Sequence, residues 1–494
     1  MTFLIVTLSY LAILVGIIIF KSRTVKTEED FVVAGRGVPV YLLVGTLVCT
    51  WIGSGSLFGT AGLTFRTGFS ELWFSAGAWI GIILVYFIAA RVRKIAKYTL
   101  TDLLETRYNN AARLLGTITI IVAYLVIAGY QFKGGGRFIS ILTEGAISPE
   151  TGMLISCILI VTFTALAGMV SIVSIDIFNG VIMIVAMVVA LPLAIGVHGG
   201  WDEVVGTINA KSPEYLSLFE GHDATWILGI ILPTFLLLMS ESSMYQKFSS
   251  AKDAISARKA VIGMLIGVVV IEVLMCTLAV VGYAIYSEDA RFFLADGSVN
   301  RGMAEEIILR IGFEQLPPLA GSMLFAAGVA IILSTGNTFL MVTSTNVSRD
   351  LLAKYIYKNK DVNTIKIQRV SVVILGLLAY LLVSQFETIL EMAFISYTMI
   401  GASLAPVLLA SFFWKRVTAQ GGVASIICGM SVPVINKLME SAGMSFDIFG
   451  ISFPVDTDYI AIPSLALSLA ALIIVSLLTP ASPESKWKPF FQQD

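Results

Sequence analysis

Four oxygen-bearing side chains stand close together in an otherwise apolar stretch near residue 335. In "ILSTGNTFL", Ser334, Thr335, Asn337 and Thr338 occupy positions i, i+1, i+3 and i+4, which lie on nearly one face of a helix. Their hydroxyl and amide oxygens are hard ligands, which suit an ion such as sodium rather than a soft metal. The pattern indicates an ion site, although hydroxyls in apolar helices also often bond to the carbonyl four residues back.

A lone carboxylate, Asp176, stands in a second apolar stretch, "SIVSIDIFNG", three residues before Asn179. With a helical rise of about 1.5 Å per residue, Asp176 lies roughly 9 Å from the cytoplasmic end of its segment. Ser334 lies about 24 Å from the outer end of its own segment, so both fall in the same half of a membrane. We therefore expect Asp176 and Ser334 to be neighbours.

Glycines interrupt a third apolar stretch, "CTWIGSGSLFGTAG". Ser54 and Ser56 lie among these glycines, near the middle of the stretch. Apolar segments interrupted by glycine indicate broken helices, whose freed carbonyls can coordinate an ion. The alternative is that the glycines only allow two helices to pack closely.

Two cations, Lys133 and Arg137, flank three glycines inside the apolar run "GYQFKGGGRF". Charge within such a run is costly in lipid and indicates a function. Arg137 lies two turns from Glu144, so we expect its side chain to reach the outer interface. Lys133 is deeper, and is interpreted either as an anchor for a solute or as half of a structural ion pair, with Glu272 as the candidate partner.

The composition shows what must position these side chains. Hydrophobic residues make up 57% and charged residues 13% of the 494, and the mean hydropathy is +0.89. Such a chain cannot cover itself with a charged surface, so it is expected to lie in a bilayer. The four cysteines fall in apolar stretches without CxxC spacing, which argues against a disulfide framework or a zinc site.

Apolar stretches of about 20 residues recur along the chain, each long enough to cross a hydrocarbon core of roughly 30 Å. We expect about thirteen membrane helices. The first stretch lacks a basic start and a cleavage site, so it is interpreted as a helix rather than a signal peptide. Lys and Arg predict the orientation, because with the N-terminus outside about 24 of the 32 fall in cytoplasmic segments. The outer loops 198–224, 287–317 and 439–457 are expected to form short surface helices.

Motifs of enzymes and nucleotide-driven pumps are missing from the sequence. His198 and His222, the two histidines, both fall in an outer loop, so neither HExxH nor a histidine-based triad is available. "GSGSLFG" is not GxGxxG, and no GK[ST] follows it, which excludes a P-loop. We expect no enzyme, no organic cofactor and no nucleic-acid partner.

Several longer motifs resemble the sodium/solute symporter family, which includes sodium-coupled sugar, proline, sialic-acid and choline carriers. The motifs are "GRGVPVYLLVGTLVCTWIGSGS", "YTLTDLLETRY", "AGMVSIVSIDIFNG", "MYQKFSSAKDAISARKA", the Ser-rich helix ending in "NVSRD", and "FFWKRVTAQGGVASIICG". The resemblance covers nearly the whole chain. This sequence departs from the family pattern at Ile175, where Thr is usual, and at Asn179, where Gln is usual.

The resemblance implies an all-α membrane protein with a LeuT-like core of two five-helix inverted repeats. It places an extra N-terminal helix and a cytoplasmic loop in residues 1–37, the repeats in 38–197 and 225–413, and two C-terminal helices and a short tail in 414–494. The first and sixth core helices would be broken near the middle of the membrane, and transport would proceed by alternating access around that point. The location implied is the plasma membrane, with the C-terminus in the cytoplasm.

The resemblance also implies the ion sites. The first sodium would be held by the backbone carbonyls of Cys49, Ile52 and Ile331 and the hydroxyls of Ser334 and Thr335. A second sodium, present in some relatives, would correspond to Asp176, Asn337 and Thr338. The family has two serines where this chain has Asn337 and Thr338, so the first site matches the pattern better.

The solute site is expected beside the broken helices. We predict that it is lined by Trp51, Ser54, Ser56, Phe74, Gln131, Lys133 and Glu241. The segment "TWIGSG" is close to that of choline carriers, whose aromatic boxes suit a quaternary cation. Lys133 favours a carboxylate instead, and Glu241 is interpreted either as a solute ligand or as a structural acid.

The favoured function is a sodium symporter that imports a small carboxylate-bearing solute such as an amino acid or a monocarboxylate. The first alternative is a sodium-coupled carrier of a cationic amine, based on "TWIGSG" and Glu241. The second, from another class, is a channel or a substrate sensor that uses the same fold without coupled transport. The partners expected in every case are the bilayer and a small solute or ion.

Overall fold

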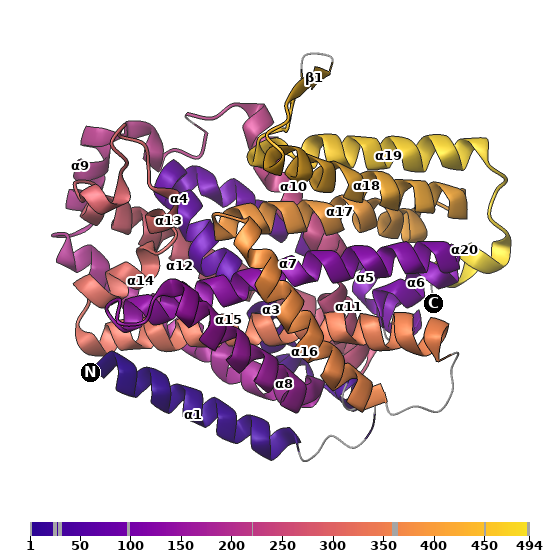
Figure 1. The fold of residues 1–494 in the computed structure, drawn as a ribbon, viewed down its shortest axis with the longest axis horizontal. Coiled ribbons are helices and arrows are strands. Elements are labelled where there is room, and N and C mark those ends of the chain that lie inside the picture. Colours follow the sequence, from indigo (N-terminus) through magenta and orange to yellow (C-terminus); the bar gives the residue numbers. More distant parts are fainter. Residues whose placement is uncertain are drawn as a thin grey trace.

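The chain folds into a bundle of long helices in the computed structural model, which describes residues 2–22, 27, 32–95, 99–219, 221–357, 364–448 and 451–491. Figure 1 shows most of these helices running along one common direction. Twelve segments of the described part are long and apolar enough to cross a membrane. One of them, Gly55–Ile95, is divided at Gly68, whose φ is 64°. The part of Gly55–Ile95 before Gly68 continues the shorter Val40–Trp51 as one broken crossing, so the described segments make the expected thirteen crossings.

In chain order the helices are α1 (Thr2–Ser22), α3 (Val40–Trp51), α4 (Ala61–Thr67), α5 (Leu72–Ile95), α6 (Leu100–Arg107), α7 (Asn110–Leu142), α8 (Pro149–Val197), α9 (Trp201–Lys211), α10 (Ala224–Ser240), α11 (Ser242–Ser250), α12 (Ala254–Tyr286), α13 (Arg301–Ala304), α14 (Ile307–Arg310), α15 (Pro318–Thr345), α16 (Thr364–Leu382), α17 (Ile389–Phe413), α18 (Ala419–Ser441), α19 (Ala461–Leu478) and α20 (Glu484–Phe491). π-helical turns at Gly55–Thr60 and Asn346–Ile356 adjoin α4 and α15.

Polar residues immediately before several long helices cap the N-termini of those helices. The side chain of Asn109 accepts a hydrogen bond from the Ala112 amide at 2.9 Å before α7, and that of Asp253 accepts one from the Ser256 amide at 2.7 Å before α12. Each of these caps satisfies an amide that the first helical turn leaves free. Within α8, Gly168 has a φ of 71° and divides the helix into two membrane segments, because only glycine adopts this conformation without strain.

Burial separates the core helices from those at the lipid boundary. The most apolar part of α17 is 94% buried and that of α15 is 89% buried, whereas that of α1 is 17% buried. In Figure 1, α1 lies along one side of the bundle, and α18 and α19 lie along the opposite side. The side chains of α15 and α17 can therefore meet those of other helices inside the protein, where a solute site would be built.

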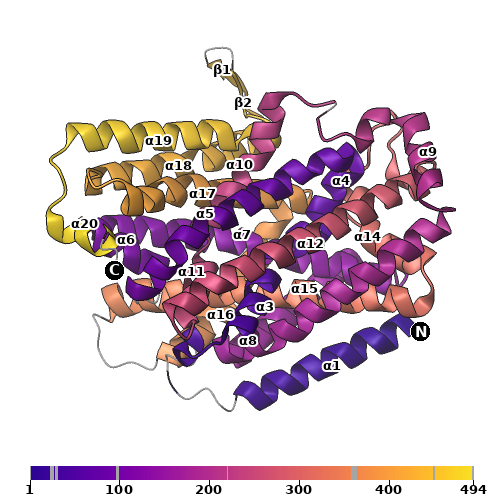
Figure 2. The same cartoon turned by 180° about the vertical axis from the view of Figure 1, so that it is seen from behind.

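Short elements gather at the end of the bundle where α1 begins, which we call the outer end after the Lys and Arg distribution. Figure 2 shows α9 and α14 there. The expectation of short surface helices is met in the loops 198–224 and 287–317. It is wrong for 439–457, which contains a β-hairpin of β1 (Phe446–Ile448) and β2 (Ile451–Phe453). There the rings of Phe446 and Phe453 stack across the strands at 5.4 Å, which stabilises the pairing.

Candidate functional site

The first core helix is broken directly after α3. The helix ends at Trp51, and Ile52 takes an extended conformation with a ψ of 97° before helical structure resumes. Gly53 stands at the break, where a β-carbon would lie 2.8 Å from the Thr335 methyl group. Only glycine therefore lets the chain approach α15 this closely. The glycine pattern in the sequence predicted this break.

The break frees two backbone carbonyls, and α15 supplies hydroxyls to them. Thr335 Oγ1 donates to the carbonyls of Cys49 and Ile52, at 3.1 Å in both cases, and Ser334 Oγ lies 3.5 Å from the Cys49 carbonyl. Ile331 lies one helical turn before Thr335 on the same buried helix. Four of the five residues expected at the first sodium site thus meet at one point. Carbonyl and hydroxyl oxygens of this kind fit a hard monovalent cation.

Asp176 adjoins this oxygen cluster from α8. Its side chain is fully buried and accepts hydrogen bonds from Ser334 Oγ and from Thr46 Oγ1, both at 2.5 Å. The expectation that Asp176 and Ser334 are neighbours is confirmed by this contact. Asn179, one turn further on, accepts a hydrogen bond from the Tyr10 hydroxyl of α1 at 2.7 Å.

Of the other two residues expected at a second sodium site, Asn337 contacts another part of α8. Asn337 Oδ1 accepts a hydrogen bond from Thr164 Oγ1 at 3.0 Å. Among the described residues no hydrogen bond joins Asp176 to Asn337 or to Thr338, whose hydroxyl has no partner in the protein. The structure therefore brings Asp176 to the first oxygen cluster and leaves Asn337 and Thr338 apart from it.

Two buried polar side chains meet at the break with part of their hydrogen-bonding capacity unused. The Ser54 amide donates to Gln131 Oε1 of α7 at 3.0 Å, and both side chains are fully buried. Ser54 Oγ and Gln131 Nε2 have no hydrogen-bond partner in the protein. A buried donor without a partner is costly, so such groups indicate the place of a ligand.

Aromatic rings surround this pair of donors. The ring of Tyr397 on α17 lies 6.4 Å from that of Trp51 and 6.5 Å from that of Phe74, and its hydroxyl lies 3.0 Å from the Tyr130 hydroxyl. Ser56, on the turn after Ser54, is also buried. Trp51, Phe74 and the two serines, all expected here, thus lie around the break. Sequence reasoning missed Tyr130 and Tyr397, although Tyr130 directly precedes Gln131.

Glu241 lies at a second break, between α10 and α11. Its side chain accepts hydrogen bonds from the Ser243 amide at 3.2 Å, from the Ser243 hydroxyl at 2.8 Å and from the Tyr124 hydroxyl. Tyr124 precedes Gln131 by seven residues on α7, or roughly 10 Å of helix. Glu241 therefore begins α11 as its N-terminal cap, and these contacts engage its carboxylate.

Lys133 contacts the segment that leads into α17, and Arg137 is linked to the start of α17 through Glu305. Lys133 is half-buried and its ammonium donates to the Phe386 carbonyl at 2.6 Å. The expected ion pair with Glu272 is wrong, because the Glu272 carboxylate accepts the indole N–H groups of Trp51 and Trp79, at 2.7 and 2.5 Å.

Arg137 does not reach the outer interface, so that expectation is also wrong. Its guanidinium is buried and forms an ion pair with Glu305. The Glu305 carboxylate also accepts the amides of Ile389 and Leu390, at 3.1 and 2.8 Å, and so caps the start of α17. The outer end of α7 is therefore covered by the chain before α17 and by the residues after α13.

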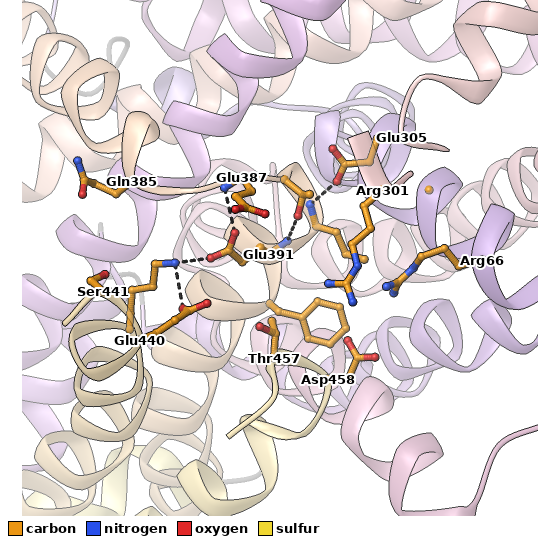
Figure 3. Close-up of a pocket in the computed structure, with 15 residues that line it drawn as sticks. Arg66, Arg301, Glu305, Gln385, Glu387, Glu391, Glu440, Ser441, Thr457 and Asp458 are labelled. Carbon is orange, nitrogen blue, oxygen red and sulfur yellow. Dashed lines mark hydrogen bonds and ion pairs between the residues drawn. The ribbon is translucent and has the colours of Figure 1, made fainter. Parts of the chain in front are cut away.

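A cleft of about 350 Å³ opens at the outer end, above these contacts. Figure 3 shows the basic and acidic side chains that line it, among them Arg66, Arg301, Glu387 and Glu391. Phe394 also lines the cleft, and its ring lies 5.2 Å from that of Phe74. The cleft therefore leads from the outer end toward the aromatic rings at the break.

Charged groups pack together at the opposite end. Asp350, which is buried, accepts from Thr101 Oγ1 at 2.8 Å and pairs with Arg113, which also contacts Asp102 at 3.1 Å. Burial alone would raise the pKa of the Glu105 carboxyl, but hydrogen bonds from Lys354 and Arg113 outweigh it and hold the pKa below its usual value. This network fastens α6 and α7 to the turn after α15.

Comparison with known proteins identifies relatives over almost the full length of the chain. Residues 31–429 match the model of the sodium:solute symporter family. The high-affinity proline transporter PutP of Bacillus subtilis is 26% identical over 487 residues, which cover 95% of this chain and 96% of the relative. The sodium/proline symporter of Staphylococcus aureus is 24% identical over 503 residues, covering 97% and 93%.

Solved structures show the same fold at low sequence identity. The substrate-bound outward-open state of a Na+-coupled sialic acid symporter matches with a TM-score of 0.79 and 14% identity, covering 98% of this chain and 99% of the other. The structure of MhsT in complex with L-phenylalanine matches with a TM-score of 0.54 and 14% identity, covering 89% and 97%. At such identities the likeness concerns the fold, and it bears out the expected LeuT-like arrangement.

Proposed function

This chain belongs to the sodium:solute symporter family, and from that premise we propose that it imports proline or a closely related small carboxylate-bearing solute together with sodium. The family and the twelve apolar helices make it a multi-pass membrane protein whose partners are sodium and a small solute. Relatives that are named proline transporters and that match end to end support the choice of solute.

The observation that carries this proposal is the pair of unused donors at the α3 break. Ser54 Oγ and Gln131 Nε2 are buried, adjacent and without partners in the protein. A solute carboxylate supplies two acceptor oxygens and would satisfy both, with charge-assisted hydrogen bonds. The rings of Trp51, Phe74 and Tyr397 would then cover the apolar part of the solute. A small ring such as that of proline suits this arrangement.

Sodium is proposed to bind where the Cys49 and Ile52 carbonyls meet Ser334, Thr335 and the Ile331 carbonyl. The Ile52 carbonyl and the Ser54 amide are separated only by Gly53, so an ion that holds the first also positions the second. Binding of the ion and binding of the solute would therefore favour each other, which is the reciprocal coupling that symport requires.

The sodium gradient supplies enough free energy for concentrative uptake. One sodium ion that enters down about 100 mV releases roughly 2.3 kcal/mol, and a tenfold concentration gradient adds about 1.4 kcal/mol. Together these support roughly 500-fold accumulation of a neutral solute for each sodium ion. An outer cleft, with a charged network packed at the other end, supports import by alternating access from the outside.

We extend the proposal to the organisation of the chain. Residues 38–197 and 225–413 would form the two inverted repeats, since the first helix of each is broken, at Ile52 and at Glu241. Residues 1–37 and 414–494 would flank them. The N-terminus would lie outside and the C-terminus in the cytoplasm of the plasma membrane, as the Lys and Arg distribution predicts.

Uptake of radiolabelled proline into proteoliposomes tests the function. With an inward sodium gradient we expect uptake well above that with potassium on both sides, and competition by small carboxylates. Choline is the matched competitor, because the aromatic rings at the break would also suit a quaternary cation. Sodium-dependent uptake of choline without uptake of any carboxylate would overturn the choice of solute, and conductance without coupled uptake would overturn symport.

A further inference from the structure

Lys247 on α11 is a cation that no part of the proposed transport reaction has used. Its side chain is fully buried, in a short helix whose every residue is buried. The ammonium donates to the carbonyl of Thr46 at 2.9 Å and to the hydroxyl of Thr50. Both residues lie on α3, the first half of the broken helix. A buried ammonium is costly, so a negative charge nearby is expected.

Asp176 supplies that negative charge, and Thr46 lies between its carboxylate and the Lys247 ammonium. Thr46 receives the Lys247 ammonium on its carbonyl and donates its hydroxyl to Asp176 Oδ2 at 2.5 Å. The second carboxylate oxygen accepts from Ser334 at 2.5 Å. Neither Lys247 nor Asp176 has an ion pair within 4.0 Å among the described residues. Asp176 faces the Lys247 ammonium through Thr46, and Glu241 is a second carboxylate whose charge acts on Lys247.

The oxygens around Asp176 are arranged for this lysine rather than for a further ion. The hydroxyl and carbonyl of Thr46 and the hydroxyl of Thr50 are all engaged by Lys247 or by Asp176. Asn337 is turned toward Thr164, as described above. A sodium ion beside Asp176 would also face the Lys247 ammonium, and like charges repel strongly where water is excluded.

We propose that the Lys247 ammonium is a built-in cation that balances Asp176 in place of a second sodium ion, so that each transport cycle carries one sodium per solute. This inference rests on the proposed sodium symport. Lys247 would then determine the number of sodium ions per cycle. Its ammonium already balances the Asp176 charge, so no second sodium ion is needed there.

Counting bound sodium on the purified full-length protein tests the inference without relying on transport. Equilibrium binding of radioactive sodium should give one ion per wild-type protein, with a Hill coefficient near one. Lys247→Met is one atom shorter, so it vacates the ammonium position beside the Thr46 carbonyl and the Thr50 hydroxyl. We expect this variant to bind two sodium ions, with the Hill coefficient rising toward two.

Three further variants show whether the charge is responsible. The double variant Lys247→Met with Asp176→Asn removes both charges and should return the count to one. Lys247→Arg keeps the cation and should keep one ion. Lys211→Met removes a lysine that contacts Ser287 and Glu288 on the outer surface, and should leave both the count and the affinity unchanged.

The outcomes separate failure of the inference from failure of the function. Two ions on the wild-type protein, or one ion on a folded Lys247→Met protein, would overturn the inference while leaving symport intact. An absence of sodium binding and of sodium-dependent proline uptake would overturn the proposed function itself. If Lys247→Met does not fold, the reversal potential of proline uptake in wild-type proteoliposomes decides the matter, with one sodium per proline expected and two contradicting the proposal.

Discussion

The two broken helices of the core have the same backbone shape at the break and opposite chemistry. At the first break Ile52 has φ and ψ of −75° and 97°, and at the second Glu241 has −65° and 98°. The first is flanked by glycines and leaves the donors of Ser54 and Gln131 unused. At the second, Glu241 itself caps the following helix and engages Tyr124 and Ser243.

This difference explains why only one break is suited to bind cargo. A break whose own side chain satisfies the freed amides is complete in the protein alone and needs no ligand. A break bordered by glycine exposes carbonyls and donors that other groups must satisfy. We infer that the first break holds the ion and the solute, while the second holds α10 and α11 at a fixed angle. The following variants test that division, from the largest expected effect to the smallest.

Gly53→Ala should have the largest effect. Its β-carbon would lie 2.8 Å from the Thr335 methyl group and 3.1 Å from Gln131 Nε2, so α3 and α15 would have to separate where the ion is proposed to bind. We expect sodium-dependent uptake to fall at least about 100-fold, or roughly 2.7 kcal/mol. Gly45→Ala is the matched control on the same helix, because its nearest contact is an ordinary 3.4 Å. Equal uptake by the two variants would contradict the assignment.

Glu241→Ala should lower stability more than it alters solute recognition. The variant leaves the hydroxyls of Ser243 and Tyr124 buried without their acceptor, which costs about 1–3 kcal/mol, and removes a helix cap worth about 1 kcal/mol. The melting temperature in detergent should fall clearly, with the KM of the remaining uptake nearly unchanged. Glu241→Gln keeps an acceptor, so its melting temperature should fall less. A large rise in KM with unchanged melting temperature would instead make Glu241 a solute ligand.

Gln131→Leu should show the reverse behaviour. Its free Nε2 group is proposed to meet the solute carboxylate, and a hydrogen bond to a charged group contributes about 1.5–3 kcal/mol. The KM for proline should rise by at least about tenfold. The melting temperature without solute should change less than in Glu241→Ala, because the variant removes the unpaired Nε2 donor, although it also removes the Oε1 acceptor of the Ser54 amide. Loss of stability without a change in KM would show that the glutamine is structural.

Lys133→Met should have the smallest effect of the four. The ammonium is engaged by the Phe386 carbonyl, so the variant removes one hydrogen bond that positions the start of α17. We expect about a threefold change in KM, which corresponds to a typical net hydrogen bond. A rise of tenfold or more would show that Lys133 is the carboxylate anchor, as the sequence alone suggested.

Local sequence patterns were sufficient for the features that depend on residues near one another. The glycines around Ser54 predicted the first break, and Ser334 and Thr335 predicted hydroxyls that meet it, whereas Asn337 contacts Thr164 instead. The common depth of Asp176 and Ser334 predicted their contact, since the rise of a helix fixes how far along it each residue lies. These features need only the spacing of residues within one helix.

The partners of the other buried charges could not be derived in this way. Lys133 binds the Phe386 carbonyl, Arg137 pairs with Glu305, and Glu272 accepts two indole N–H groups. The packing of helices far apart in sequence decides which buried charge meets which group. The contacts of Tyr397 and of Lys247 could not be predicted from the sequence for the same reason.

The sequence by itself determined that the chain crosses a membrane many times, where its first core helix breaks and which hydroxyls meet that break, because hydrophobicity and helical spacing act within a segment. Only the tertiary structure decided which break is satisfied by the protein and which is left for a ligand, and which cation faces Asp176. In a buried interior without water, every charge and donor must be satisfied by whatever the fold brings beside it.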